Sequence, residues 1–525
     1  MRLRLFLMNL VAALGLCACA AAAARPPLEG APVAVPVENG VLGGRALDGV
    51  RAFRGIPYAA PPVGALRWRP PQPAPAWSGP REAIRFGADC LQHPLPTFID
   101  PGSGQPTSED CLYLNVWAPA DGARHPVMVW IHGGGFTIGS GAMAATDGAA
   151  LARKGVVVVT LNYRLGRFGF FAHPALTRDH PDEATGNYAL MDQIAALAWV
   201  KRNIKAFGGD PAKVTLFGES AGGGSVIALM GSPAARGLFQ QAIVESGGGR
   251  DDLPGLDRAA ADYPAGNAAG QAFAAKAGLK DPDAAALRAL PADKVLGDLD
   301  FINNRNRTDY AGMVIDGRIV TDNPAAIFAR GEEAPVPLVI GFNSAELGGA
   351  KAFTAASTKQ AAARFGPGEP ALRKLYDPQG GEDGLATNFL SDVIFAEPAR
   401  LLARAHAKAG RPTYLYQFSY VAQAKREKEP GAGHASEIPY VFDTVAEVDP
   451  KSTAQDRAAA AATSALWTSF ALHGRPAAKG SAWPAYGAAD TLMDIAPDGA
   501  RPLSGRTRAR LDFLEAAWGT MTSRR

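Results

Sequence analysis

The segment Gly218-Glu219-Ser220-Ala221-Gly222 places a serine between small residues, directly after a short apolar run. That run, 214–217, predicts a buried strand, and the run 224–230 predicts a helix. A serine between a strand and a helix lies on a strained turn that exposes its hydroxyl, and the flanking glycines avoid side-chain collisions. We therefore predict Ser220 as a nucleophile, although the five-residue pattern alone also fits a glycine-rich turn with an incidental serine.

A serine hydroxyl at its ordinary pKa is a poor nucleophile and needs a base, together with an acid that orients the base. After a turn of this kind the two partners follow along the chain as acid, then histidine. Glu346 follows the apolar run 337–342, and His434 ends a glycine-rich loop after the run 414–420. The sequence thus predicts Glu346 as the acid and His434 as the base.

Three other residues compete for these roles. Asp316, in an Ile-Asp-Gly turn, and Glu437 are the rival acids, and we expect Glu437 to be paired near the surface. His473 is the rival base, but it precedes Gly474 and a proline, which is typical of a helix C-terminus. We favour Glu346 and His434.

A third component is predicted from the run 127–131, which leads into His132-Gly133-Gly134-Gly135-Phe136. A turn without side chains lets backbone N–H groups converge on one point, where they can bind a developing oxyanion. The predicted donors are the amides of Gly134, Gly135 and Ala221, and one such donor lowers the barrier by about 3 kcal/mol. A triple glycine alone would be read as a flexible loop; its position upstream of Ser220 favours the catalytic interpretation.

The secondary-structure elements of the fold must bring these loops together. Short apolar runs bounded by Gly, Pro, Asn or Ser predict buried strands at 127–131, 156–161, 214–217, 242–245, 337–342 and 414–420. The segment 187–206 has helical spacing of its apolar residues. Strands that alternate with helices predict an α/β fold with a mostly parallel central sheet flanked by helices. The Ala-rich segment from about 250 to 335 is predicted as a helical, cap-like insertion over the carboxyl edge of the sheet.

Composition excludes several classes of protein. The 525 residues are 47 % hydrophobic and 20 % charged, as in globular proteins, and 53 Lys and Arg against 50 Asp and Glu leave a net charge of only +3. No basic field indicates a nucleic-acid partner. No segment after the first 24 residues is apolar enough to predict a membrane span. No low-complexity linker divides the rest of the chain, so we expect one domain over 25–525.

The first 24 residues have the pattern of a secretory signal peptide. Arg2 and Arg4 precede an apolar run over 5–16 and small residues over 18–24. The sequence therefore predicts export to the periplasm or the medium. Two alternatives remain open: a retained anchor, and cleavage before Cys19, which would leave a lipid-modified cysteine.

The remaining cysteines, Cys90 and Cys111, support export. In an oxidising compartment they would form one disulfide, whose loop closure is worth about 3 kcal/mol; the alternative is two buried free thiols. Two cysteines without a pair of histidines at ligand spacing do not predict a zinc site, and we expect neither a metal nor another cofactor.

Several motifs in one order resemble the type-B carboxylesterase family, which includes the cholinesterases. They extend over about 35–520: FRGIPYA (53–59), PPVG (61–64), EDCLYLNV (109–116), NYR (162–164), GN (186–187), DQ (192–193), the Ser220 turn, and His434 with EIPY (437–440). The resemblance implies an α/β-hydrolase fold and an exported serine carboxylesterase that hydrolyses small-molecule esters through an acyl-enzyme. A glutamate as third member of the triad is typical of that family, in agreement with Glu346.

The resemblance also implies roles for residues around the triad. Cys90 and Cys111 match the family's first disulfide, Glu219 precedes the nucleophile as in the family, and Ser246 resembles a serine that supports the acid–base pair. The loop between the cysteines has no tryptophan, which argues against cation–π recognition of quaternary ammonium groups. Arg250, beside Asp251 and Asp252, is a candidate for binding a substrate carboxylate, but a solvated surface cluster is the favoured interpretation.

Other functions fit parts of the pattern. The same triad supports amide, carbamate or thioester hydrolysis, and a non-catalytic binding protein, as the neuroligins are, would use the same scaffold. Such binding proteins typically lose the nucleophile, whereas Ser220 is intact. The sequence does not determine the natural ester or the oligomeric state.

Overall fold

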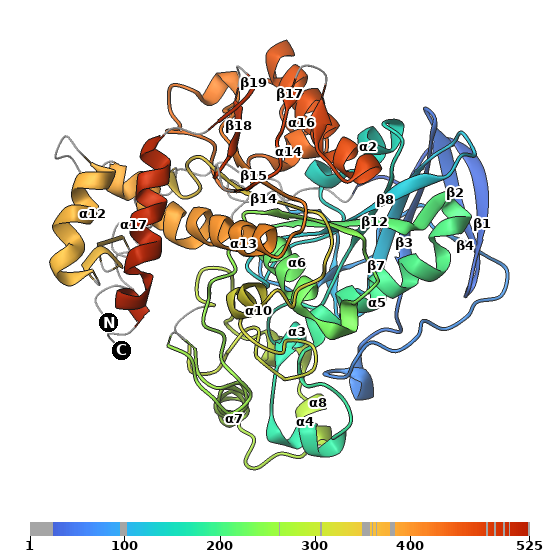
Figure 1. Ribbon diagram of the computed structural model, residues 1–525. Helices are drawn as coiled ribbons and strands as arrows, with labels where there is room; N and C mark the ends of the chain where they lie inside the picture. Colours follow the sequence, from blue (N-terminus) through green and yellow to red (C-terminus); the bar gives the residue numbers. More distant parts are fainter. Residues whose placement is uncertain are drawn as a thin grey trace, which may run out of the picture.

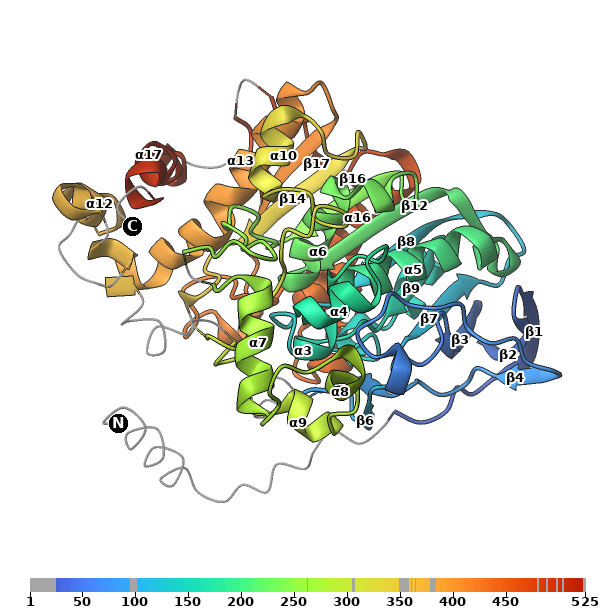
Figure 2. The same cartoon turned by 90° about the horizontal axis from the view of Figure 1, so that it is seen from below.

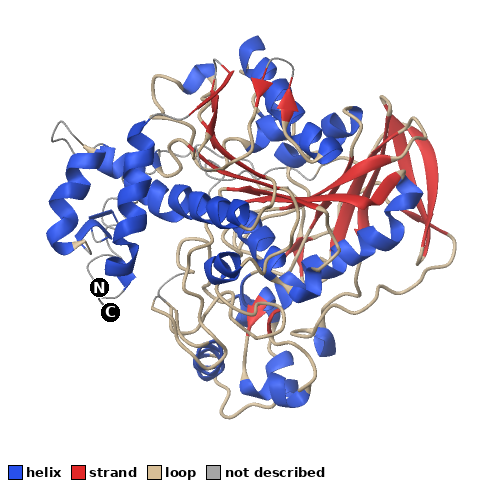
Figure 3. Ribbon diagram, viewed as in Figure 1, coloured by secondary structure: helices blue, strands red, loops and turns tan. Residues whose placement is uncertain are grey.

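A mostly parallel sheet runs through the molecule, with helices on both of its faces (Figures 1 and 3). The computed structural model describes residues 25–94, 102–261, 263–304, 307–348, 358–359, 361–363, 365–377, 384–478, 481–487, 490–496, 499–502 and 505–522. The strand order is β1-β2-β3-β7-β9-β8-β12-β13-β14-β15-β18-β19, and pairing is parallel from β9 to β18. The parallel strands are β9 (Val157–Leu161), β8 (His125–Ile131), β12 (Gly209–Glu219), β13 (Gln241–Glu245), β14 (Leu338–Asn343), β15 (Thr413–Phe418) and β18 (Met493–Ala496). This confirms the predicted α/β architecture and its six strands.

Alternating side chains of the central strands fill two separate cores. In β8, Val127, Val129 and Ile131 belong to one hydrophobic cluster, whereas Met128 and Trp130 belong to another. Because successive side chains of a strand point to opposite faces, each face needs its own helical layer. The first face packs against α5 (Tyr188–Asn203) and α6 (Ala221–Gly231), and the second against α2 (Ala149–Arg153) and α16 (Ala454–His473).

The N-terminal edge of the sheet is antiparallel and was not predicted. It consists of β1 (Ala31–Val37), β2 (Gly40–Leu47), β3 (Val50–Pro57) and β7 (Tyr113–Pro119), and the short β4 (Pro80–Glu82) pairs with β2 in parallel. β1 contains two prolines and β2 two adjacent glycines, so neither reads as a continuous apolar run. Prolines are tolerated here because β1 forms the edge of the sheet.

In its described residues, the segment between β13 and β14 contains four helices, and long loops precede α7 and α10. They are α7 (Gly266–Lys276), α8 (Ala284–Arg288), α9 (Ala292–Leu296) and α10 (Pro324–Arg330). Figure 2 shows α7, α8 and α9 gathered on one side of the sheet. The insertion is therefore less helical than its alanine content suggests, since two of its helices have only five residues each.

A smaller hydrophobic cluster lies at the end of the molecule opposite β1 (Figure 1). There α12 (Glu369–Tyr376) packs against α17 (Gly505–Thr522), with Leu372 and Leu514 fully buried between them (Figure 2). α13 (Glu397–Lys408) connects this cluster to the sheet, where it contacts β14 and β15. No helix in the described ranges combines the length and the apolar character needed to cross a bilayer.

Candidate active site

Ser220 lies on the tight turn between β12 and α6. Its backbone has φ +53° and ψ −121°, a strained combination for a residue with a side chain. A Cβ on Gly218 would lie 2.7 Å from the carbonyl oxygen of Ile131, and one on Gly222 would collide with the same oxygen. Glycine is required on both sides of Ser220 because the turn packs directly against the end of β8.

Ser220, His434 and Glu346 come together from three loops. The Oγ of Ser220 lies 2.9 Å from Nε2 of His434, and Nδ1 of His434 lies 2.7 Å from Oε2 of Glu346. The backbone N–H of His434 also donates to the carbonyl of Glu346 at 2.9 Å. All three loops follow the carboxyl ends of parallel strands, which meet at one edge of the sheet.

The carboxylate of Glu346 is held on both of its oxygens. Besides His434 on Oε2, the hydroxyl of Ser246 donates to Oε1 at 2.6 Å, and the backbone N–H of Asn343 donates to the same oxygen at 2.7 Å. The Ser246 contact is the one that the family resemblance implied. The fixed carboxylate in turn fixes the plane of the His434 ring.

The glycine-rich turn after β8 packs against Ser220. A Cβ on Gly133 would lie 3.0 Å from Cβ of Ser220 and 2.7 Å from Oε2 of Glu219. Within the described part of the chain, the N–H groups of Gly134 and Gly135 donate to no protein acceptor. These amides are therefore available to a ligand, which is what an oxyanion hole requires.

A cavity of about 220 Å³ opens beside Ser220. Gly135 and Ala221 line it, whereas Gly134 does not. Other lining residues come from the insertion between β13 and β14: Leu253, Pro254, Tyr263, Asn304, Tyr310, Ala311, Gly312, Met313 and Pro324. The insertion thus forms much of the wall of the cavity.

Phe395 is a cavity residue that sequence reasoning missed. It lies in η8 (Asp392–Ala396), a π-helical segment, and its ring stacks on the imidazole of His434 with centroids 4.8 Å apart. No motif surrounds Phe395 in the sequence. Only the packing of η8 against the His434 loop reveals it.

Two further carboxyl groups are buried close to the triad. Burial raises the pKa of Glu219 to about 7 and that of Glu437 to about 8, because a charged carboxylate is poorly solvated there. The side-chain amide of Asn343 donates to Glu437, and Oε1 of Glu219 lies 3.2 Å from Nε2 of His434. The expectation that Glu437 pairs near the surface was wrong, since its side chain is fully buried.

His434 is surrounded by these acids. Burial alone would lower the pKa of His434, but the carboxylates of Glu219 and Glu346 outweigh it and raise this pKa above its usual value. The imidazolium form is therefore stabilised in place, as is needed for a base that accepts a proton from serine.

The rival residues lie elsewhere. Oδ1 of Asp316 accepts three backbone N–H bonds within its own turn, and Oδ2 accepts a bond from Asn187. His473 is the last residue of α16, with Gly474 in the left-handed conformation after it, as predicted.

Arg250 is not part of a solvated surface cluster. Its guanidinium forms an ion pair with the buried Glu397 and stacks on the ring of Trp518, 4.1 Å from the centroid. It joins the Ser246 loop to α13 and α17, and it is not among the residues that line the cavity. The neighbouring Asp251 does line the cavity.

Cys90 and Cys111 form a disulfide. In the ranges that the structure describes, no three His, Cys, Asp or Glu side chains are grouped as metal ligands would be. The predicted signal peptide, with Cys19, lies outside the described residues.

A family model described as "Carboxylesterase family" matches residues 31–366 and 382–513. The chain belongs to the carboxylesterase family. It is accordingly a carboxylic ester hydrolase with the α/β-hydrolase fold, as the motifs predicted.

Several carboxylesterases are similar to this chain over most of its length. The fumonisin B1 esterase of Sphingopyxis macrogoltabida is 38 % identical over 83 % of this chain and 82 % of its own length. The para-nitrobenzyl esterase of Bacillus subtilis is 35 % identical over 86 % of this chain and 92 % of its own. A solved PNB esterase structure superposes with a TM-score of 0.77 at 32 % identity, over 91 % of this chain and 99 % of that chain.

Proposed function

We propose that this carboxylesterase hydrolyses small-molecule esters through an acyl-enzyme formed on Ser220, with His434 as the base and Glu346 as the acid that orients it. The observation that carries the proposal is the chain of two hydrogen bonds, 2.9 Å and 2.7 Å long, from Ser220 through His434 to Glu346. The free amides of the glycine turn beside Ser220 support it further.

Acylation follows from this arrangement. The oxygen of Ser220 attacks the ester carbonyl carbon while Nε2 of His434 accepts the hydroxyl proton, and Glu346 stabilises the resulting imidazolium. The carbonyl oxygen becomes an oxyanion that the amides of Gly134, Gly135 and Ala221 bind. The imidazolium then donates its proton to the leaving alkoxide, and the alcohol departs.

Deacylation repeats the sequence with water. His434 removes a proton from a water molecule, the hydroxide attacks the acyl carbon, and the protonated His434 returns the proton to Ser220 as the ester bond breaks. No cofactor enters these steps.

The test is the hydrolysis of p-nitrophenyl esters of graded acyl length by the purified protein and by Ser220→Ala. We expect an initial burst of p-nitrophenol with the wild type and a loss of at least about 10³-fold in kcat for the variant. Activity retained by Ser220→Ala would overturn the assignment of the nucleophile. A folded wild type that hydrolyses amides, carbamates or thioesters but no ester would support the alternative chemistry on the same residues.

We also propose that the chain is exported. The Cys90–Cys111 disulfide supports this, because such bonds persist mainly in oxidising compartments. The N-terminal pattern of charged, apolar and small residues supports it independently.

A further inference from the structure

Tyr310 is a buried residue of the insertion that lines the cavity beside Ser220. It is only 5 % exposed and belongs to the largest hydrophobic cluster. Within the described part of the chain, its hydroxyl forms no hydrogen bond. A hydroxyl that loses its hydration on folding normally gains a protein partner in exchange. Tyr310 thus carries a polar group that the fold itself does not use.

The Tyr310 hydroxyl opens toward the cavity. Protein atoms do not enclose its oxygen, whereas they do enclose the unpartnered hydroxyl of Tyr416. Burial raises the pKa of Tyr310, and Tyr263, which lines the same cavity, adds to this shift, so the two rings lie near each other. With a raised pKa the phenol stays protonated at neutral pH. The hydroxyl is therefore a hydrogen-bond donor that shares the cavity with Ser220.

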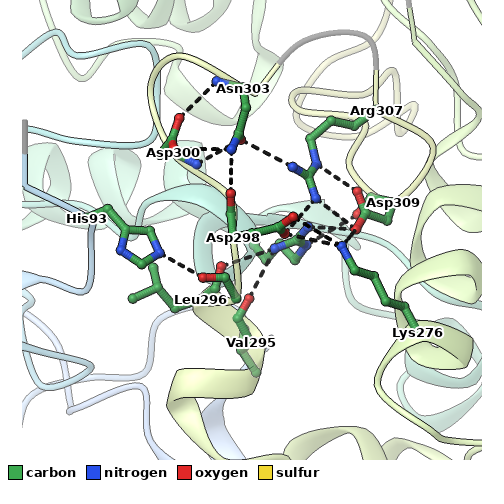
Figure 4. Close-up of polar contacts among 11 residues, drawn as sticks. His93, Lys276, Val295, Leu296, Asp298, Asp300, Asn303, Arg307 and Asp309 are labelled. Carbon is green, nitrogen blue, oxygen red and sulfur yellow. Dashed lines mark hydrogen bonds and ion pairs between the residues drawn. The ribbon is translucent and has the colours of Figure 1, made fainter. Parts of the chain in front are cut away.

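Ion pairs fix the chain just before Tyr310. Asp309 pairs with Arg307 at 2.7 Å and with Lys276 of α7 at 3.1 Å (Figure 4). Arg167, in α3 (Gly166–Gly169), pairs with the same carboxylate at 3.0 Å and donates to the carbonyl of Asp309 at 3.3 Å. Both the side chain and the backbone of Asp309 are thus tied to the rest of the protein.

Hydrogen bonds fix the chain that follows Tyr310. The side-chain amide of Asn187 donates to the carbonyl of Val314 at 2.7 Å, and its oxygen accepts from the N–H of Val314 at 3.1 Å. The N–H of Ile315 donates to the carbonyl of Pro254 at 2.8 Å. Because the segment 309–315 is anchored at both ends, little conformational freedom is lost when the Tyr310 hydroxyl binds a ligand.

Three other polar side chains of the cavity are already engaged within the protein. The hydroxyl of Ser220 contacts the catalytic base, and that of Ser246 donates to the acid of the triad. The side-chain amide of Asn304 donates to the carbonyl of Gly135 at 3.2 Å. Tyr310 differs from these three residues, since its donor is left for a ligand.

The charges around the cavity favour an uncharged ligand group. Among the described residues that line it there is no Lys or Arg, and the carboxylate of Asp251 is part of the wall. Arg250 is paired with Glu397 and does not line the cavity. An anionic substrate group would therefore lose its hydration without gaining a cation. A carbonyl, hydroxyl or ether oxygen loses less hydration and can accept a bond from the phenol.

We propose that Tyr310 determines substrate specificity: its hydroxyl donates a hydrogen bond to a second, uncharged oxygen of the substrate, beyond the ester group that Ser220 attacks. Esters that carry such an oxygen are then hydrolysed in preference to plain alkyl esters of the same length, because only they pair with the buried donor. This inference rests on the proposed function, since it names the substrate class of the same site.

The test compares the wild type with Tyr310→Phe on pairs of esters that differ in one oxygen. Two pairs vary the acyl side: p-nitrophenyl levulinate with valerate, and p-nitrophenyl methoxyacetate with butyrate. One pair varies the alcohol side: methoxyethyl acetate with butyl acetate. We expect Tyr310→Phe to lower kcat/KM about five- to tenfold on an oxygenated ester and less than about twofold on its plain partner. Comparing the two proteins on each ester cancels the intrinsic reactivity of that ester.

Tyr414→Phe is the matched control. Tyr414 lies in β15 and is 8 % exposed, and in the described ranges its hydroxyl also has no protein partner. It packs against Phe470 in the cluster on the other face of the sheet and does not line the cavity. Tyr414→Phe should change kcat/KM by less than about twofold on every ester. Neither variant should lower the unfolding temperature, because neither loses a hydrogen bond within the protein.

The possible failures are distinguishable. Equal effects of Tyr310→Phe on both members of every ester pair, whether large or absent, would overturn the inference. A Tyr310→Phe protein that unfolds at a lower temperature than Tyr414→Phe would also overturn it, since the hydroxyl would then have a structural task. A folded wild type without activity on any ester would instead contradict the proposed function.

Discussion

At the scale of single residues, the acids around His434 have different tasks. Glu346 contacts Nδ1 and is fully held by hydrogen bonds, so it orients the ring. Glu219 lies near Nε2, the nitrogen that faces Ser220, and acts on His434 through its charge. This difference determines what each acid contributes to the pH dependence of the reaction.

We expect Glu219→Gln to move the acidic limb of the kcat/KM profile to lower pH. The neutral imidazole is the base, and the Glu219 carboxylate raises the pKa of His434 by stabilising the imidazolium. Removing that charge lowers the pKa of His434, so the neutral form persists at lower pH. A shift of about one pH unit, measured with p-nitrophenyl acetate, is the expected result.

Because the pKa of Glu219 itself is raised to about 7, the carboxylate acts mainly above that pH. Asp210→Asn, at the second residue of β12, where the carboxylate accepts a bond from the N–H of Ala212, controls for the loss of one negative charge outside the candidate active site. A limb that stays in place, or moves to higher pH, would show that Glu219 does not act on His434 electrostatically.

At the scale of elements, the close packing of two turns makes the active site. The turn after β8 and the turn after β12 approach so closely that a Cβ on Gly133 or on Gly222 would collide with atoms of the opposite turn. β8 and β12 are neighbours in the sheet, with Ile131 paired to Gly218, so their carboxyl ends bring the two turns together. The loops that follow β8 and β12 meet because the two strands are neighbours in the sheet. Their separation along the chain plays no part in this contact.

Gly133→Ala should therefore reduce kcat/KM by at least about 10²-fold. The added methyl group would lie 2.7 Å from Glu219 and 3.0 Å from Cβ of Ser220, which displaces the oxyanion turn or the nucleophile. Gly433→Ala is the control, because Gly433 precedes His434 and a Cβ there meets nothing within 4 Å. Equal effects of the two substitutions in steady-state assays would argue against a role for this packing.

At the scale of the whole molecule, the sheet and the insertion together build the candidate active site. The sheet positions Ser220, His434 and Glu346, while the insertion supplies much of the cavity wall and the contact from Asn304. Family membership defines the chemistry, but the insertion and η8 shape the cavity that receives the ester.

The proposed export predicts where the mature protein begins. Expressed with its own leader in a Gram-negative host, the full chain should yield a periplasmic or secreted protein that begins near residue 25, as measured by intact mass. A membrane-bound form with a mass increase on Cys19 would show the lipoprotein alternative instead. Protein retained in the cytoplasm with an unprocessed N-terminus would contradict export.

Much of the fold and site could be predicted because the responsible signals are local. Six of the seven parallel strands contain the apolar runs that predicted them, and the Ser220 turn is marked by glycines that close packing requires. The antiparallel strands β1 and β2 escaped prediction because their burial is partial and their residues are mixed. Phe395 and Asn304 escaped because nothing near them in sequence signals a contact with His434 or Gly135.

The sequence by itself predicted which residues would carry the chemistry, since reactive side chains, turn glycines and hydrophobic runs are properties of short segments. Only the tertiary structure decided the environment of those residues: the burial of Glu437, the pairing of Arg250 with Glu397, and the sign of φ at Phe136. Each of these depends on segments far apart in the chain that packing brings together. The reason is that torsional and hydrophobic preferences act locally, whereas solvation and strain depend on every neighbour that surrounds a group in space.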